Sequence, residues 1–417
     1  MLEQKEGSHA VADAVALCRP EVICAYPISP QTHIVEALSD KVRTGELSPC
    51  EYVSVESEFG AMSVAIGASA TGARAYTATA SQGLLYMVEA LYNASGLGLP
   101  IVMTLANRAI GAPINIWNDH SDSMSQRDSG WIQLYAETNQ EALDLHIQAY
   151  KLAEELSLPV MVCMDGFILT HAHERVDIPT QDQVDGFLPP YEPRQVLDPT
   201  EPVTIGAMVG PEAFFEVKYL MHAKQMQALD LVPEIASEFA QAFGRDSGGL
   251  IRSYRTEDAE TVIVALGSVI GTIQDVVDEM RDEGVKVGVV GIRCFRPYPL
   301  EEVREALGHA RRVVVVEKAF AVGVGGIVGQ NVRLALSGLP TTVYDVVAGL
   351  GGRPITKRSL HTLLADAIED RLEGQTFLDL NLEIVERELL RQKERRLSGP
   401  HAENMLRDIG IVAARPH

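Results

Sequence analysis

Residues 22–31 read VICAYPISPQ, and this stretch decides the class of fold. Its first half is a short apolar, β-rich run, and its second half is a polar turn that Pro27 and Pro30 stiffen by fixing their φ angles. A longer helical pattern follows. The same order of strand, polar turn and helix recurs through roughly the first 165 residues, which is typical of a parallel sheet covered by helices. The sequence therefore predicts an α/β domain with a doubly wound sheet.

The first half of the chain supplies the elements of this sheet. Strands are expected over 22–26, 52–55, 73–79, 101–105 and 160–164, and the helices include 57–70, 81–94 and 139–156. Ser57 and Ser81 stand at the starts of two of these helices, where a hydroxyl can accept a hydrogen bond from an unpaired backbone N–H. We therefore expect both serines to act as N-caps.

The second half predicts another α/β unit behind a long connection. A loop spans about 172–210, a helix starts at Pro211 and should break or kink at Pro233, and 244–257 is expected to be a linker. Strands are expected over 261–266, 285–290, 312–316 and 342–346, with helices near 270–281, 300–309 and 327–336. A charged helix over 376–397 has too little apolar surface for its own core, so it is expected to be a docking arm, with a solvated terminal helix as the alternative.

Composition argues against several classes of function. The net charge is −22, so the phosphate backbone of a nucleic acid would be repelled. The five cysteines form no C-x-x-C pair, which argues against an iron–sulfur cluster or structural zinc in this chain and fits a reducing cytoplasm. The apolar runs are too short to cross a bilayer. We expect a soluble, cytoplasmic protein without nucleic-acid or membrane partners.

Polar side chains follow four successive strands of the first half. Ser29 follows the first strand, Glu58 the second, Ser81 and Gln82 the third, and Arg108 the fourth. Ligands of open parallel sheets bind outside the carboxyl ends of the strands, so these side chains should share one rim. Any one of these segments alone would be explained as a loop residue or a helix cap. The four together, which include an acid and a guanidinium, favour an active site.

Three further motifs carry weaker signals. Asp119-His120-Ser121-Asp122 is explained better by loop capping than by metal binding, and His171-x-His173 better by a surface loop than by zinc, so no metal ligands are predicted. The glycine run Gly323–Gly329 resembles a dinucleotide fingerprint, but its sixth position is Val328 instead of glycine. Close packing of a helix on a strand explains it better.

The same rim segments resemble those of a known family, the α chains of archaeal-type pyruvate:ferredoxin oxidoreductases. Matching segments occur in the same order from about residue 5 to residue 370: Tyr26–Glu36, Val55–Glu58, Thr77–Gly83, Asn107–Asp119, Gly130–Gln133, Phe167–His171 and Tyr254–Glu260. The resemblance implies a pyrimidine-type thiamine-diphosphate-binding domain over 1–245, with an extended connecting segment from about 172. A transketolase C-terminal-like domain over 258–372 and a helical docking arm over 373–417 would follow.

The resemblance also implies roles for the rim residues. Glu58 matches the glutamate that bonds N1′ of the aminopyrimidine ring, and Arg108 matches the residue that clamps the carboxylate of a 2-oxoacid. Ser29 matches a threonine whose hydroxyl bonds the substrate, and Pro27, Ser81 and Gln82 are expected to contact the cofactor. Because serine lacks the threonine methyl that restricts the rotamer, the substrate stays open. Pyruvate is expected, with aromatic (phenylglyoxylate-type), branched-chain, 2-oxoglutarate and oxalate enzymes as alternatives.

The resemblance also implies partner subunits, because some motifs of the family are missing from this chain. The G-D-G segment that binds the diphosphate in the family, with its downstream asparagine, is missing, and so are cluster cysteines. A β subunit is therefore expected to bring Mg²⁺, the diphosphate half of the site and a 4Fe–4S cluster, with γ and ferredoxin-like δ subunits completing the enzyme. The expected reaction is pyruvate + CoA + oxidised ferredoxin ⇌ acetyl-CoA + CO₂ + reduced ferredoxin. Alternatives from other classes are a nicotinamide-binding protein and a non-catalytic scaffold subunit.

Overall fold

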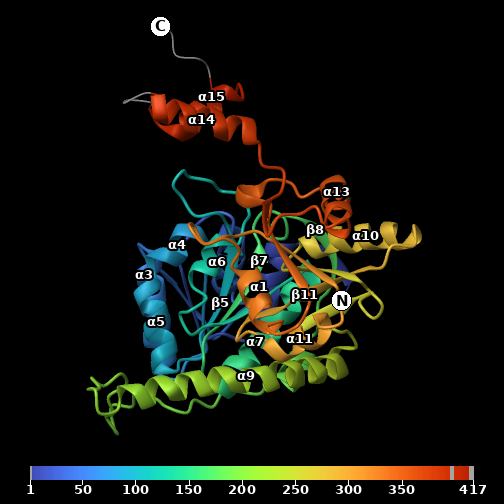
Figure 1. Ribbon diagram of the computed structural model, residues 1–417. Helices are drawn as coiled ribbons and strands as arrows, with labels where there is room; N and C mark the ends of the chain where they lie inside the picture. Colours follow the sequence, from blue (N-terminus) through green and yellow to red (C-terminus); the bar gives the residue numbers. More distant parts are fainter. Residues whose placement is uncertain (1, 395–398, 413–417) are drawn as a thin grey trace.

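The computed structural model describes residues 2–394 and 399–412, and these form a body of two packed α/β units with a helical arm at one end (Figure 1). The first unit is built on a seven-stranded sheet in the order β12-β6-β7-β5-β4-β2-β3. Its strands are β2 (Val22–Ala25), β3 (Glu51–Ser54), β4 (Ala75–Thr79), β5 (Val102–Asn107), β6 (Ile132–Tyr135), β7 (Val160–Asp165) and β12 (Cys294–Arg296). All neighbours are parallel except β12, which runs antiparallel to β6.

Helices cover both faces of this sheet because its strands are apolar on both sides. The neighbours Ile23 and Cys24 of β2 are both buried and belong to different hydrophobic cores, as the two-residue period of a strand requires. One core is completed by helices that include α1 and α7, and the other by α3 and α5. The helices up to residue 156 are α1 (Gly7–Leu17), α2 (Thr32–Thr44), α3 (Glu58–Ala70), α4 (Ser81–Tyr86), α5 (Val88–Leu97), α6 (Ser121–Ser125) and α7 (Asn139–Leu156).

The two expected N-caps have different outcomes. Ser57 caps α3 as predicted, since its hydroxyl accepts the N–H of Gly60 at 3.1 Å. For Ser81 the prediction was wrong, because Ala80 occupies the N-cap position of α4. Ser81 is the first residue of the helix and has a left-handed φ of 51°. The expected helix over 81–94 is also divided, at Met87, into α4 and α5.

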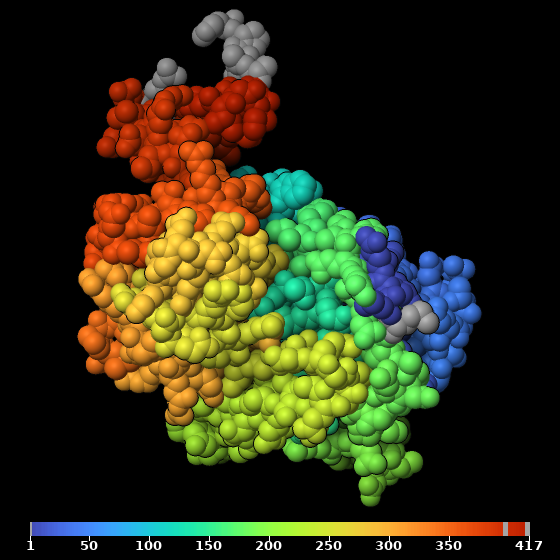
Figure 2. All heavy atoms as spheres, turned by 90° about the vertical axis from the view of Figure 1, so that its right-hand side faces the viewer, coloured from blue at the N-terminus to red at the C-terminus, as the bar shows by residue number. Residues whose placement is uncertain are grey.

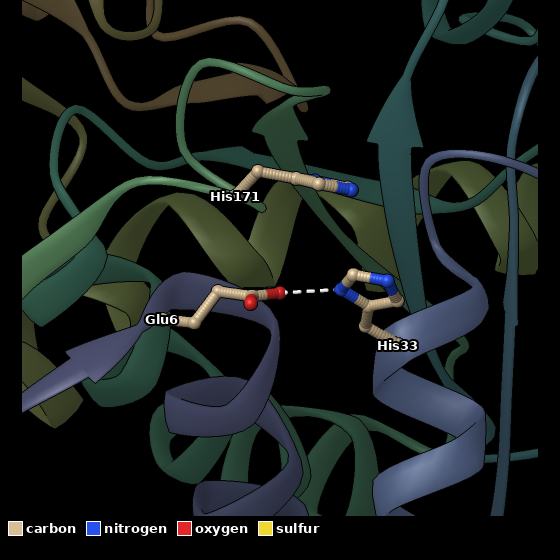
Figure 3. A group of neighbouring side chains, drawn as sticks. All are labelled: Glu6, His33 and His171. Atoms are coloured by element: carbon tan, nitrogen blue, oxygen red, sulfur yellow. Dashed lines mark hydrogen bonds and ion pairs between the residues drawn. The ribbon is translucent and has the colours of Figure 1, made fainter.

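A two-stranded sheet that the sequence did not predict lies beside the first unit. In it, β1 (Leu2–Glu6) pairs antiparallel with β8 (His173–Asp177). The turn between β7 and β8 brings His171 beside Glu6 at the end of β1 and His33 in the first turn of α2 (Figure 3).

One long helix, α9 (Phe214–Phe243), runs along the lower edge of the body in Figure 1 after the short α8 (Gln181–Phe187). The helix does not break at Pro233, because α9 continues through the proline, and the alternative expectation of a kink there stays a prediction. Val232, Ile235 and Phe239 around it are buried in the same core as α7, and this packing stabilises the helix where Pro233 lacks an N–H.

The second unit has a six-stranded sheet in the order β15-β14-β13-β10-β11-β9. Its strands are β9 (Ile251–Tyr254), β10 (Thr261–Ala265), β11 (Val287–Ile292), β13 (Arg312–Glu317), β14 (Thr342–Val347) and β15 (Gln375–Phe377). Its helices are α10 (Val269–Asp282), α11 (Leu300–Leu307), α12 (Val328–Ala335) and α13 (Lys357–Ile368), with the 3₁₀ turn η1 (Leu350–Gly352).

The linker expected over 244–257 was wrong in part, because β9 lies within it and pairs antiparallel with β11. The proposed domain boundaries stay a prediction, and β12 crosses into the first sheet.

The end of the chain folds as two helices, α14 (Leu382–Glu394) and α15 (His401–Asp408), which stand apart from the body on the side of the second unit (Figures 1 and 2). The helix expected from residue 376 begins later because β15 occupies 375–377, and residues 395–397 of that prediction lie outside the described residues. Within the described ranges, no helix is both long enough and apolar enough to span a membrane.

Candidate active site at the carboxyl edge of the first sheet

The four rim segments lie on neighbouring strands, as predicted. β5, β4, β2 and β3 are consecutive in the sheet and parallel, so the residues that follow them meet at one edge. A cavity of about 560 Å³ lined by Arg19, Arg74 and Asp185 lies instead near the amino-terminal ends of these strands, and is therefore separate from the rim.

Glu58 begins α3 and points its carboxylate at the start of α4. The side chain is 7% exposed, and it makes no hydrogen bond to another described residue. A Cβ placed on Gly83 would lie 2.7 Å from its Oε1 and 2.4 Å from the hydroxyl oxygen of Thr79, so only glycine fits between them. The buried Thr79 hydroxyl likewise lacks a partner among the described residues. A buried carboxylate and hydroxyl without partners fit a polar ligand, because burial without a hydrogen bond is costly.

Ser81 and Gln82 form the turn beside this carboxylate. The Ser81 hydroxyl donates to the carbonyl oxygen of Ala109, which joins the ends of β4 and β5. The amide nitrogen of Gln82 lies over Gly111, 2.6 Å from where a Cβ would stand. The turn is thus held against the segment that follows Arg108.

Arg108 joins the ends of β5 and β2. Its guanidinium donates to the carbonyl oxygens of Ser29 at 2.9 Å and Asn115 at 3.1 Å, and no carboxylate of the described chain lies within ion-pair distance. The residue is 6% exposed, and burial lowers the pKa of its guanidinium although the charge of Asp122 opposes this. Arg108 therefore forms no ion pair with the described residues. A buried cation bonded only to carbonyl groups suits an anionic ligand.

The turn before α2 carries the remaining predicted residues. Pro27 and Ser29 are exposed, and Ser29 is tied to the site through its carbonyl oxygen. The structure thus brings together the segments of Ser29, Ser81, Gln82 and Arg108, with Glu58 adjoining them at Gly83.

Asp122 connects the rim segments, a role that the sequence did not predict beyond loop capping. Its carboxylate accepts hydrogen bonds from the backbone N–H groups of Ser81 (3.0 Å), Arg108 (2.9 Å) and Ser123 (2.7 Å) and from the side-chain amide of Asn107 (2.8 Å). The side chain is fully buried, and burial raises its pKa to about 6 although the four hydrogen bonds oppose the shift. Asp122 therefore fixes the positions of two rim segments.

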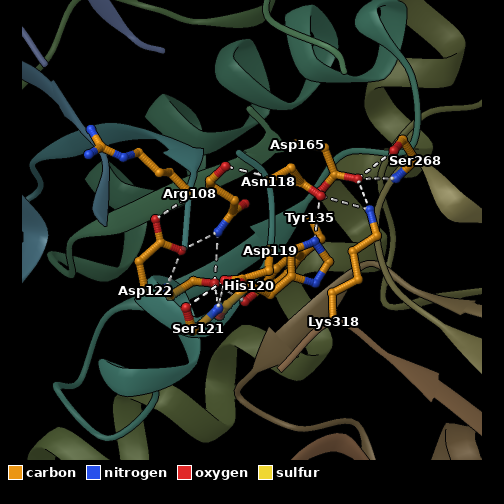
Figure 4. Close-up of polar contacts among 12 residues, drawn as sticks. Arg108, Asn118, Asp119, His120, Ser121, Asp122, Tyr135, Asp165, Ser268 and Lys318 are labelled. Atoms are coloured by element: carbon orange, nitrogen blue, oxygen red, sulfur yellow. Dashed lines mark hydrogen bonds and ion pairs between the residues drawn. The ribbon is translucent and has the colours of Figure 1, made fainter. Parts of the chain in front are cut away.

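The rest of the Asp119–Asp122 motif holds the loop after Arg108 to the second unit. As predicted, Asp119 caps the loop by accepting the N–H of Ser121, and it also accepts that of Gly351 from the second unit. His120 bonds Asp165 at 2.6 Å, and Lys318 at the end of β13 donates to the other oxygen of Asp165 at 2.6 Å (Figure 4). His120, Asp165 and Lys318 form a buried polar cluster that links the first unit to the second. The Arg108 guanidinium points away from this cluster in Figure 4.

The glycine run packs a helix closely on the second sheet, as predicted. The N–H groups of Ile327, Val328 and Gly329 at the start of α12 all donate to the carboxylate of Glu317, and burial raises the pKa of Glu317 to about 7. A Cβ on Gly329 would lie 1.9 Å from an oxygen of Asp345. A dinucleotide diphosphate would need these same N–H groups, so the nicotinamide alternative is disfavoured.

Comparison with known sequences gives the family. The family model described as "Pyruvate flavodoxin/ferredoxin oxidoreductase, thiamine diP-bdg" matches residues 13–237, and "Pyruvate:ferredoxin oxidoreductase core domain II" matches 259–360. "Pyruvate synthase subunit PorA" of Methanosarcina barkeri is 48% identical over 91% of this chain and 97% of its own. PorA of Methanocaldococcus jannaschii is 49% identical over 86% and 92%, and "Ketoisovalerate oxidoreductase subunit VorA" of Pyrococcus horikoshii is 41% identical over 86% and 92%.

Solved structures share the fold. A 2-oxoglutarate:ferredoxin oxidoreductase from Magnetococcus marinus matches with a TM-score of 0.71 at 20% identity, over 88% of this chain and 65% of that one. A split-gene transketolase matches with a TM-score of 0.52 at 14% identity, over 89% of this chain and 100% of that one. The expected fold class, a thiamine-diphosphate-type domain followed by a transketolase-like one, is confirmed.

The chain therefore belongs to the pyruvate:ferredoxin oxidoreductase family of 2-oxoacid oxidoreductases, whose amino-terminal domain binds thiamine diphosphate. Within that family it is similar over about nine-tenths of its length to the subunits named PorA, so the resemblance seen in the rim segments is confirmed.

Proposed function

We propose that this chain is the α subunit of an enzyme that converts pyruvate, CoA and oxidised ferredoxin reversibly to acetyl-CoA, CO₂ and reduced ferredoxin. The observation that carries the proposal is a pair of buried groups at one sheet edge that have no charged partner among the described residues. The Glu58 carboxylate accepts no hydrogen bond from them, and the Arg108 guanidinium donates only to two carbonyl oxygens. A cofactor and an anionic substrate supply what these groups lack.

The residues at the rim fit thiamine diphosphate. Glu58 holds N1′ of the aminopyrimidine ring, and the glycine at 83 leaves room for that contact. Ser81, Gln82 and Pro27 border the ring. When bound, the cofactor supplies a nucleophilic carbon and an electron sink for decarboxylation of a 2-oxoacid. The Glu58 carboxyl group would hydrogen-bond N1′, and its buried position would strengthen that bond.

Arg108 and Ser29 supply the substrate contacts in this proposal. The guanidinium binds the carboxylate of the 2-oxoacid, and the Ser29 hydroxyl bonds the oxygen of its keto group. Six relatives named pyruvate synthase subunit PorA, at 44–49% identity, favour pyruvate. The relatives named ketoisovalerate oxidoreductase, at 40–41%, make a branched-chain 2-oxoacid the second candidate.

Partner subunits complete the enzyme. A β subunit contributes Mg²⁺, the diphosphate half of the site and a 4Fe–4S cluster, and γ and ferredoxin-like δ subunits carry electrons onward. Of the arm expected over 373–417, the helices α14 and α15 are the docking element for such a partner, supported by exposed leucines at 382, 389 and 390 of α14, whereas 375–377 belong to the second sheet. The five cysteines are unpaired, which supports assembly in the cytoplasm.

A substrate panel on the purified complex tests the proposal. Viologen reduction is measured with CoA and, in turn, pyruvate, 2-oxoisovalerate, phenylglyoxylate, 2-oxoglutarate and oxalate. The highest kcat/KM with pyruvate is expected. A higher value with 2-oxoisovalerate would establish the branched-chain alternative, and no 2-oxoacid-dependent reduction would contradict the proposal.

A further inference from the structure

Three potential metal ligands meet away from the rim contacts described above. Glu6 ends β1, His33 lies in the first turn of α2, and His171 lies in the turn that follows β7. One ligand atom from each lies within 4.8 Å of the other two, and Figure 3 shows the three side chains converging. The sequence interpretation of His171-x-His173 as a surface loop did not foresee this, because the neighbours of His171 come from distant segments.

A hydrogen bond joins Glu6 and His33 directly, and a bound metal would take its place. His33 Nδ1 lies 2.6 Å from Glu6 Oε1, and the His33 and His171 rings lie 4.7 Å apart between centroids. His171 Nδ1 lies 2.8 Å from the Thr170 hydroxyl oxygen. When Nδ1 donates to that oxygen, the Nε2 lone pair is free for a metal. Metal-bound histidines usually have such a second hydrogen bond.

We propose that Glu6, His33 and His171 form a site for a divalent transition-metal ion, and that zinc is the ion the site fits best. Two imidazoles and one carboxylate are a known three-ligand set for zinc, with a fourth position left open. Magnesium prefers oxygen ligands in octahedral geometry, so this site is chemically distinct from a Mg²⁺–diphosphate site. Its expected effect is to tie β1, the start of α2 and the turn after β7 together.

Zinc titration of the full-length, tag-free chain tests the site. The chain is stripped with a chelator and titrated by calorimetry with Zn²⁺ and separately with Mg²⁺. Matched variants are His33→Ala, His171→Ala, Glu6→Gln and, as control, His222→Ala on the exposed side of α9. We expect wild type and the His222 variant to bind one zinc more per chain than the His33→Ala/His171→Ala double variant. Each single ligand variant should bind it at least about tenfold more weakly.

Cobalt spectroscopy gives a second readout that does not depend on activity. Co²⁺ in this site should give the visible absorption bands of a four-coordinate nitrogen–oxygen set, and the bands should be absent in the double variant. Melting curves without metal check that the variants fold, and His33→Gln replaces His33→Ala if they do not. Equal zinc stoichiometry and affinity in wild type and double variant would overturn the proposal, as would Mg²⁺ binding as tight as Zn²⁺ binding.

Discussion

The backbone N–H of Arg108 donates to the carboxylate of Asp122 over 2.9 Å, and the same carboxylate oxygen accepts the N–H of Ser81 over 3.0 Å. One buried acid thus fixes the ends of two neighbouring strands, β4 and β5. Ser81 and Gln82, which are proposed to contact the cofactor, follow β4, and Arg108, which is proposed to bind the substrate, follows β5. Their relative position depends on an acid that need not touch either ligand.

Replacing Asp122 with asparagine should shift the rim segments relative to one another while the chain still folds. The amide has one acceptor oxygen where the carboxylate has two, so two of the four donors lose their partner. The expected loss of unfolding free energy is about 2–6 kcal/mol, at about 1–3 kcal/mol for each unsatisfied buried group. Urea unfolding measures it, with Asp128→Asn on the neighbouring exposed turn as control. A free energy of unfolding within error of wild type would contradict the role of Asp122.

The pH dependence of stability should also report on Asp122. Its pKa is raised by burial from 3.8 to about 6, so the folded chain holds this proton more tightly than the unfolded chain. Binding of this proton stabilises the folded chain by about 3 kcal/mol below about pH 4, and this stabilisation is lost as the pH rises through about 6. The difference in unfolding free energy between wild type and Asp122→Asn should therefore shrink between these pH values. A constant difference would show that Asp122 does not titrate in this window.

Gly83→Ala tests the space beside Glu58. The added methyl would stand 2.7 Å from Glu58 Oε1 and 2.4 Å from the Thr79 hydroxyl oxygen, so it would move the carboxylate. We expect kcat of the complex to fall by about 100-fold, as for misplacement of a catalytic group by about 1 Å. Gly96→Ala is the control, because its Cβ meets nothing within 4 Å. Equal activity of the two variants would show that the glycine is not needed for the cofactor.

Arg108→Ala should damage use of the 2-oxoacid. A charged hydrogen bond to a carboxylate contributes about 1.5–3 kcal/mol, so kcat/KM for the oxoacid should fall roughly ten- to hundredfold. The KM for CoA should stay unchanged. The control is Arg43→Ala, since Arg43 is exposed on α2 and pairs only with its neighbour Asp40 among the described residues. Unchanged kcat/KM in the Arg108 variant would refute the carboxylate contact.

The sequence predicts those residues of the site that come directly after a strand. Apolar runs with polar ends place Glu58 and Arg108 on one edge, because parallel strands present all their carboxyl ends together. Asp122 could not be found this way, since its partners are mostly backbone N–H groups that only the folded chain brings near. The capping prediction also failed at Ser81, which has a left-handed φ and whose N–H donates to the distant Asp122. The helix through Pro233 likewise depends on tertiary packing.

The most direct test of the central claim is Glu58→Gln in the purified complex, with Glu56→Gln as the matched control. Glu56 is exposed two residues before Glu58, whereas Glu58 is buried and without a hydrogen bond in the described chain. The measurement is CoA-dependent viologen reduction with saturating pyruvate and thiamine diphosphate. We expect kcat to fall by about 100-fold or more in the Glu58 variant, with the complex assembled and the control at the wild-type rate. Wild-type turnover in the Glu58 variant would contradict it.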